Sequence, residues 1–226
     1  MNIITTVIWL FVLLFAITVH EAAHAWSASK FGDMTARSLG RISLNPLAHI
    51  DPVGTVLVPL LLVLVGAPPF GWAKPVPVNP FLLRNPRRDN LWISAAGPAA
   101  NFLTAFSAMI LIMVIKLASP QVGVFLRNFL LGQRTLPGGI YLLEGLSVVL
   151  FYTVLTNVYL AVFNLIPVPP LDGSGILTGL LSNQGAEKYE RIRPFGFIIV
   201  LGLVYLGFLD LIIRPIQVFI YTFIIL

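Results

Sequence analysis

Two histidines and a glutamate within little more than one helical turn carry the clearest chemical signal in this sequence. His20 and His24 are four positions apart, and Glu21 directly follows the first histidine. On an α-helix, positions i and i+4 lie on the same face, so both imidazoles can bind one metal ion. Glu21 is placed to act as a general base on a water molecule at that ion. The spacing therefore predicts a hydrolytic metal site, with zinc as the metal.

These three residues stand at the end of a long apolar segment. Between Ile3 and Val19 the hydroxyl-bearing side chains are three threonines, and there is no ionisable group. Ionisable groups in or beside a membrane-length segment are energetically costly and mark functional sites by default. We therefore expect the metal site to lie inside the lipid bilayer.

The composition limits the class of protein. Of the 226 residues, 58% are hydrophobic and 10% are charged, whereas soluble domains carry roughly 25% charged residues. This composition therefore predicts an integral membrane protein. It has no cysteine, which excludes disulfides and thiolate ligands, so a metal must use His, Asp, Glu or water. The net charge of +5 comes from basic residues in short loops beside apolar spans, so we expect no nucleic-acid partner.

Four apolar runs are long or nearly long enough to cross a bilayer, which takes about 20 residues. They cover residues 3–27, 91–118, 145–166 and 195–213, and the shorter runs 53–65 and 215–226 are ambiguous. The predicted fold is an all-α polytopic membrane protein with a three-span catalytic core, short extended or re-entrant segments and one or two C-terminal spans. We divide it into a core at 1–182, and a cytoplasmic linker with a C-terminal span or hairpin at 183–226.

The basic residues predict the topology, because Lys and Arg mark cytoplasmic loops. Ten of the 14 lie in three connections: Lys30, Arg37, Arg41; Lys74, Arg84, Arg87, Arg88; Lys188, Arg191, Arg193. All three connections should share the cytoplasmic side, which puts the N-terminus outside. Residues 53–69 must then dip into the membrane and return, with a turn at 66–69; a full crossing is the alternative.

Two segments near this face do not follow a helical pattern. Apolar Ile42 and Leu44 alternate with polar neighbours, which indicates either a short strand or a loop in 36–45. In residues 70–80, proline recurs at every second or third position and forces an extended backbone. An exposed extended edge could hold an unwound substrate by strand addition.

Asp172 is the most informative candidate for a third metal ligand. A catalytic zinc ion commonly has three protein ligands and one open position. Three prolines interrupt the helix before Asp172, and Gly173 permits a tight turn after it. Irregular backbone at membrane depth is tolerated where it lines a cavity. The predicted topology puts Asp172 on the same side as His24.

Taken together, these residues resemble the site-2 protease family of intramembrane zinc metalloproteases. The segment 20–24 resembles its zinc motif, 164–173 its Asn-x-x-Pro-x-x-x-Leu-Asp-Gly motif, and 97–101 its Gly-Pro-x-x-Asn motif, in the family's order. The resemblance implies that His20, His24 and Asp172 hold one zinc ion and that Glu21 activates water. It is closest to the compact prokaryotic branch without a PDZ domain, which implies a prokaryotic inner or plasma membrane.

The same resemblance suggests roles for five further residues, and His49, one of three histidines and a neighbour of Asp51, is a sixth candidate. Asn164 would hydrogen-bond the substrate backbone or the developing oxyanion. Asn101 would line the substrate site, and Trp72, Pro75 and Val76 belong to a stretch that would bind substrate. His49 could stabilise the reaction intermediate, orient a ligand or simply cap a turn.

The expected function is zinc-dependent hydrolysis of peptide bonds in or near the transmembrane segment of membrane-anchored proteins, as in regulated intramembrane proteolysis. The partners would be transmembrane substrates and the lipid bilayer, and no feature of the sequence sets an oligomeric state. The alternatives are a metal-binding membrane transporter or sensor, and a non-catalytic scaffold. Neither alternative needs Glu21, which makes this residue the discriminating one.

Overall fold

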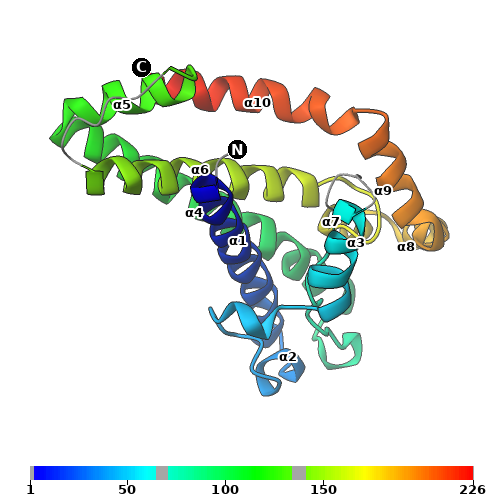
Figure 1. Cartoon of the computed structure of the whole chain (residues 1–226). Coiled ribbons are helices and arrows are strands. Elements are labelled where there is room, and N and C mark those ends of the chain that lie inside the picture. The colour runs from blue at the N-terminus through cyan, green and yellow to red at the C-terminus, as the bar shows by residue number, and fades with distance from the viewer. Residues whose placement is uncertain (1–2, 65–70, 134–140, 226) are drawn as a thin grey trace.

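The computed structural model describes residues 3–64, 71–133 and 141–225, and within these ranges the chain forms helices and irregular segments without a β-strand (Figure 1). The principal helices are α1 (Ile3–Lys30), α2 (Thr35–Ser38), α3 (Val58–Leu64), α4 (Pro86–Ala118), α5 (Pro120–Leu130), α6 (Tyr141–Asn164), α7 (Asp172–Leu180), α8 (Asn183–Glu190), α9 (Gly196–Tyr205) and α10 (Phe208–Ile225). A π-helical stretch, Pro52–Leu57, precedes α3, and three short 3-10 turns lie at Pro46–Ala48, Pro80–Leu82 and Arg193–Phe195.

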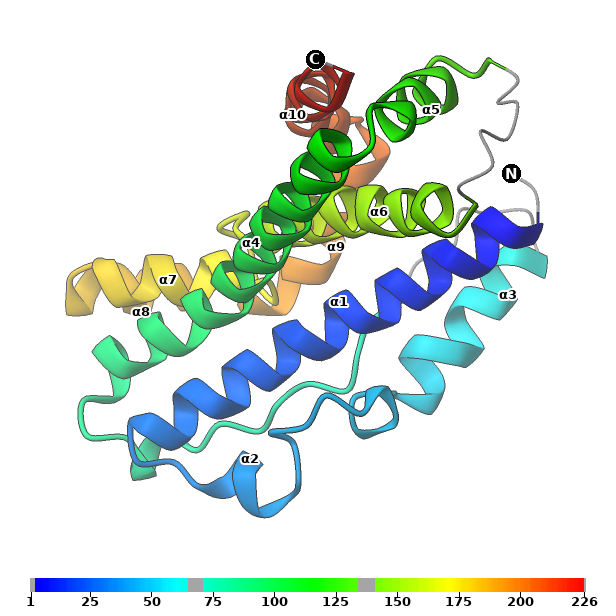
Figure 2. The same cartoon turned by 90° about the vertical axis from the view of Figure 1, so that its left-hand side faces the viewer.

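Four helices in the described ranges are long and apolar enough to cross a membrane: α1, α4, α6 and α10. The first three pack against one another in all three pairings. Figure 1 shows α6 lying across the N-terminal end of α1, and Figure 2 shows α4 crossing α6. This arrangement confirms the predicted all-α membrane protein with a three-span core.

The main apolar core lies at the end of the molecule that carries α5 and α10. Buried side chains of α4, α5, α6 and α10 form it: Ala108, Ile112, Val122, Leu126, Phe151, Val154, Leu155, Ile220 and Ile224. The Lys116 ammonium donates to the carbonyl of Ile224 at 2.7 Å, where a cation interacts favourably with the C-terminal end of a helix. The last helix is therefore attached to α4 rather than detached from the bundle.

One expectation from the sequence is wrong in detail, and one pair of alternatives is resolved. The apolar run 195–213 is not one helix, because the chain turns between α9 and α10 at Gly207, whose φ is 72°. The crossing-length helix is α10, Phe208–Ile225. For 36–45 the structure shows the loop alternative: α2 occupies Thr35–Ser38, and the residues that follow it up to Asn45 form turns and irregular backbone, with Gly40 at φ 69°.

The two ends of segment 53–69 lie together. The Trp72 N–H donates to the Gly54 carbonyl at 3.1 Å, and the Lys74 N–H donates to the His49 carbonyl at 2.9 Å. The Thr55 hydroxyl also donates to the Trp72 carbonyl at 2.8 Å. A segment whose two ends are hydrogen-bonded to each other fits the predicted dip, although its turn at 66–69 lies outside the described residues.

Candidate active site

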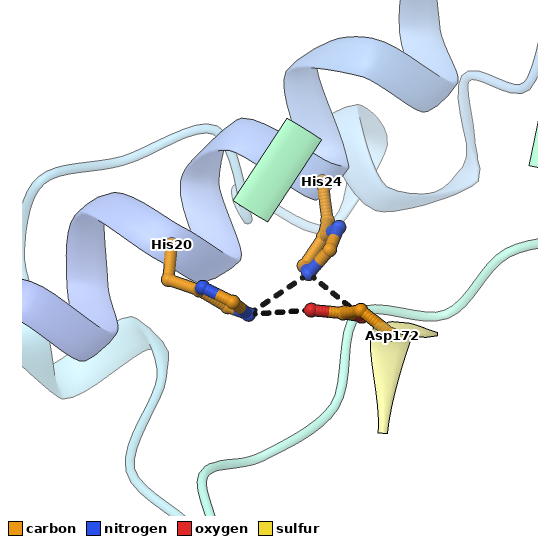
Figure 3. A group of neighbouring side chains, drawn as sticks. All are labelled: His20, His24 and Asp172. Carbon is orange, nitrogen blue, oxygen red and sulfur yellow. Dashed lines mark hydrogen bonds and ion pairs between the residues drawn. The ribbon is translucent and has the colours of Figure 1, made fainter. Parts of the chain in front are cut away.

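The two histidines of α1 and the aspartate of α7 converge on one point. His20 Nε2 and His24 Nε2 are 3.1 Å apart, and the Asp172 carboxylate oxygens lie 3.0 Å from the first and 3.3 Å from the second. Figure 3 shows the three side chains directed into this common space. Within the described ranges, this is the group of His, Asp and Glu side chains whose geometry could hold a metal ion.

Asn101 on α4 sets the orientation of the His20 ring. Its amide nitrogen lies 3.1 Å from the Ala16 carbonyl, and a carbonyl can only accept, so this atom must be the donor. The amide oxygen then faces His20 Nδ1 at 2.5 Å and must receive a proton from it. Nδ1 therefore carries the hydrogen of the neutral ring, and Nε2 presents a lone pair.

A backbone carbonyl does the same for His24. Its Nδ1 lies 2.7 Å from the carbonyl oxygen of Ile93, also on α4. Nδ1 must therefore donate, which leaves a lone pair on Nε2 of this ring as well. One neighbouring helix thus selects the same tautomer for both histidines.

The resulting arrangement needs a cation. Two nitrogen lone pairs and a carboxylate face one another at 3.0–3.3 Å, and no residue that the structure describes donates a hydrogen bond to the buried Asp172 Oδ2. A tetrahedral zinc ion with bonds of about 2.0–2.1 Å spaces its ligand atoms roughly 3.3–3.4 Å apart. The donor atoms, their separations and their two-imidazole, one-carboxylate chemistry all fit zinc, with a coordination position left for water.

The loop before α7 brings Asp172 to the histidines. A methyl group on Gly173 would lie 2.3 Å from the carbonyl oxygen of Leu165, so only glycine lets this loop pack against the start of α7. The proline-rich stretch between them is further held by Tyr189, whose hydroxyl donates to the Pro167 carbonyl at 2.8 Å. A carboxylate at the first residue of a helix is also favoured by the helix dipole.

Gly97 gives the imidazoles their space. A Cβ atom at this position would lie 2.4 Å from His24 Nε2 and 2.7 Å from His20 Cε1. The backbone of α4 therefore forms one wall of the site. Gly97 and Asn101 are one turn apart on the same face of α4, so one helix surface both makes room for the ligands and orients them.

Glu21 directly follows His20 on α1, and its role as general base stays a prediction. It is half-buried on α1 beside the ligands, and its carboxylate has no hydrogen bond or ion pair with any residue that the structure describes. An unpaired acceptor next to the ligand cluster is the arrangement that a general base needs.

Asn164 and His49 lie outside the ligand cluster, so their proposed catalytic roles stay predictions. Asn164 ends α6, and its side-chain nitrogen donates to the Leu160 carbonyl at 2.9 Å. It directly precedes Leu165, the residue in contact with Gly173, so it is close to the metal ligand in space. His49 is buried, and its Nε2 lies 2.9 Å from the Ser43 carbonyl. This contact holds the loops beneath the bundle together.

The extended segment 71–79 runs from the dip to the metal site. The backbone of Trp72 is hydrogen-bonded to Gly54 and Thr55, and the Lys74 N–H to His49. Among the described residues, the backbone of the intervening Ala73 has no such partner. At its far end Val78 packs against Ala28 and Ile93, and the carbonyl of Ile93 is the group that binds His24. The predicted substrate-binding residues Trp72, Pro75 and Val76 therefore belong to a strand-like segment anchored next to a zinc ligand.

Asp33 fixes the end of this segment. Its carboxylate accepts hydrogen bonds from the N–H groups of Asn79 at 2.6 Å and Thr35 at 2.9 Å. Burial raises the pKa of Asp33, but these hydrogen bonds, including one from the Thr35 hydroxyl, lower it more, so the pKa lies below its ordinary value. The carboxylate is therefore ionised at neutral pH and secures the segment.

Sequence patterns predicted the ligands and placed Asn101 at the site, but as a substrate-lining residue and not as the partner of His20. Asn157 on α6 is fully buried and hydrogen-bonded to Asn101, yet nothing in its local sequence distinguishes it from a helix-packing amide. The Ile93 carbonyl carries no side-chain signal at all. An asparagine in the middle of an apolar span was the only available hint.

Comparison with known proteins also indicates a zinc-dependent peptidase. The model of Peptidase family M50 matches residues 8–206 of this chain. The Bacillus subtilis protein named "Putative zinc metalloprotease YwhC" is 36% identical over 191 residues, which are 84% of this chain and 77% of that protein. "Putative zinc metalloprotease Rip2" of Mycolicibacterium smegmatis is 28% identical over 84% of this chain and 63% of its own length. No solved structure matches the chain.

Proposed function

This chain belongs to peptidase family M50 and is a zinc metalloprotease of the site-2 protease type, and we propose that it cleaves peptide bonds in or near the transmembrane segments of membrane-anchored proteins. The convergence of two imidazole lone pairs and a carboxylate on a membrane-length helix carries this proposal. The ligand cluster is buried between α1, α4 and α7, so a substrate must reach it within the bundle.

In the proposed reaction His20, His24 and Asp172 hold the zinc ion. When bound, zinc lowers the pKa of water and polarises the carbonyl of the scissile bond. Asn101 and the Ile93 carbonyl keep both histidines in the tautomer that can bind it. The protein's contribution to metal binding is therefore a site with its donor atoms already oriented.

Glu21 performs the proton transfers. It accepts a proton from the attacking water and then delivers it to the nitrogen of the leaving amine. In this proposal Asn164, whose side-chain nitrogen donates to the Leu160 carbonyl, hydrogen-bonds the substrate backbone through its amide oxygen. Its amide can also stabilise negative charge that develops on the carbonyl oxygen.

Substrate binding requires local unwinding, because a helical backbone uses its own carbonyls in intrahelical hydrogen bonds. The segment 71–79 offers a free edge at Ala73, beside the exposed residues Trp72 and Pro75 and the half-buried Val76. An unwound substrate can pair with this edge as an added strand. The anchoring of Val78 on Ile93 supports delivery of that strand to the zinc ligands.

We also propose that the site is reached by water from the cytoplasmic side of a prokaryotic inner or plasma membrane, with the N-terminus outside. Contacts between the basic connections support a common face. The Arg41 guanidinium donates to the Lys74 carbonyl, and Arg87 donates to Asn183 at 2.6 Å. These bonds join all three connections at one end of the bundle, where Lys and Arg mark the cytoplasm.

Cleavage of a single-span membrane protein in liposomes tests the proposal. Wild type is compared with Glu21→Gln, with zinc quantified in both. We expect cleavage by the wild type within or beside the span, and loss of cleavage with retained zinc in Glu21→Gln.

Two outcomes would overturn it. Cleavage confined to soluble regions of the substrate would contradict an intramembrane role. The second outcome is that neither wild type nor Glu21→Gln cleaves the substrate, while both show the same metal flux or the same partner binding. That result would favour the transporter, sensor or scaffold alternatives.

A further inference from the structure

We infer that Asn157 is a positioning residue for the metal site, acting on His20 through Asn101. The inference rests on the proposed zinc ligands. Asn157 belongs to α6 and is fully buried, as is Asn101. Within the part of the chain that the structure describes, its hydrogen bonds go to Asn101 and Thr153 and not to a metal ligand. The two amides form a hydrogen-bonded chain that leads from the backbone of α6 across α4 to the imidazole on α1.

Backbone carbonyls fix the direction of every hydrogen bond in this chain. Asn157 Nδ2 lies 2.9 Å from the Thr153 carbonyl, so this atom is the donor, and its Oδ1 faces Asn101 Nδ2 at 2.7 Å. Asn101 Nδ2 thus has two acceptors, Asn157 and the Ala16 carbonyl at 3.1 Å. Because both hydrogens of the Asn101 amide nitrogen are donated to these acceptors, the amide group is restrained from turning this nitrogen towards His20.

This restraint matters because an asparagine amide can present either face. If Asn101 turned over, its nitrogen would donate to His20 Nδ1, and the ring proton would move to Nε2, where it would block metal binding. The Ala16 carbonyl opposes that rotation at 3.1 Å, and Asn157 opposes it with the shorter contact at 2.7 Å. Asn157 therefore stabilises the metal-binding tautomer of His20 indirectly, through its hydrogen bond to Asn101.

The membrane environment strengthens the argument. The chain of amides lies among crossing-length helices, where no water replaces a lost hydrogen bond and an unsatisfied polar group is costly. A Leu at position 157 would leave one Asn101 hydrogen without an acceptor and so favour the turned-over amide. An Asp would keep an acceptor for Asn101, and in its protonated form could also donate to Thr153.

Zinc affinity, measured by chelator competition on the purified full chain, tests the inference. The variants are Asn157→Leu, Asn157→Asp, Asn101→Ala, the double variant Asn101→Ala/Asn157→Leu, and His20→Ala. Thr156→Val, a near-isosteric change at the adjacent buried position, is the matched control. Thermal stability and the visible spectrum of the cobalt-loaded protein are recorded for each.

We expect about 10-fold weaker zinc binding in Asn157→Leu and about 10–100-fold weaker binding in Asn101→Ala, the range for partners of metal ligands. The double variant should match Asn101→Ala, because Asn157 acts through Asn101. Asn157→Asp should recover the wild-type affinity and cobalt spectrum, and Thr156→Val should leave both unchanged.

Three results would contradict the inference. One is a loss of thermal stability in Asn157→Leu with unchanged zinc affinity, which indicates a packing role only. Another is an additive effect in the double variant. The third is equal weakening in Asn157→Asp and Asn157→Leu. Unchanged zinc binding in His20→Ala would instead refute the proposed ligand set itself, so the two failures are distinguishable.

Discussion

Replacing Gly97 with alanine probes how closely α4 approaches the ligands. The added methyl carbon would lie 2.4 Å from His24 Nε2, 2.6 Å from His24 Cε1 and 2.7 Å from His20 Cε1. An ordinary contact between such atoms needs about 3.5 Å, so the imidazoles or the helix must move by roughly 1 Å. Neither ring can move freely, since Asn101 and the Ile93 carbonyl hold them from the same helix.

The displacement is large for a metal site. Ligand distances at a working site hold to within about 0.2 Å, so a shift of roughly 1 Å removes at least one ligand from bonding range. We expect zinc affinity to fall about 100-fold or more, equivalent to about 2.7 kcal/mol. The fold itself should lose about 1–3 kcal/mol, the range for an overpacked site, and remain assembled.

The assay compares zinc content, zinc affinity and proteolysis of Gly97→Ala with those of Gly202→Ala. Gly202 is a helical glycine of α9 with no neighbouring atom within 4 Å of the added carbon, so it controls for the change in helix propensity. We expect zinc loss in the first variant and wild-type zinc in the second. Wild-type zinc affinity in Gly97→Ala would refute the proposed close packing of α4 on the ligands.

Three further predictions concern other parts of the site. Asp172→Ala should abolish both zinc binding and cleavage, and retention of stoichiometric zinc, measured by metal analysis, would contradict its role. Gly173→Ala, whose methyl would lie 2.3 Å from the Leu165 carbonyl, should also deplete zinc by displacing the ligand loop, and unchanged zinc would count against that packing. The lowered pKa of Asp33 means that its stabilising effect is complete above its unfolded pKa, about 3.9, and is lost as the pH falls through the folded value. The stability difference between wild type and Asp33→Asn, measured by thermal unfolding, should therefore shrink below about pH 4, and a difference that grows there would contradict the sign.

Helical spacing was enough to predict the two zinc ligands on α1, and the length of the apolar runs was enough to predict the core spans. His20 and His24 are related by helical geometry alone, and an apolar run of membrane length predicts a helix whatever packs around it. Asp172 could be predicted as well, because a break rich in proline at the end of a span has few structural uses. These features depend on neighbours in the sequence.

The residues that orient the ligands depend on neighbours in space. The sequence placed Asn101 at the site as a substrate-lining residue, but it predicted neither its contact with His20 nor the part of Asn157. Whether Asn101 faces His20, and Asn157 faces Asn101, is set by how α1, α4 and α6 cross. The break at Gly207 was missed for a related reason. The run around it is uniformly apolar, and hydropathy does not show that a glycine within it adopts a positive φ.

The central claim is that His20, His24 and Asp172 hold one zinc ion through nitrogen and oxygen atoms. X-ray absorption at the zinc edge on the purified full chain tests it most directly, together with the zinc-to-protein ratio. We expect one zinc per chain with two imidazole nitrogens and light oxygen ligands at about 2.0–2.1 Å. A folded wild-type protein that contains no zinc, or whose zinc has fewer than two imidazole ligands, would contradict it.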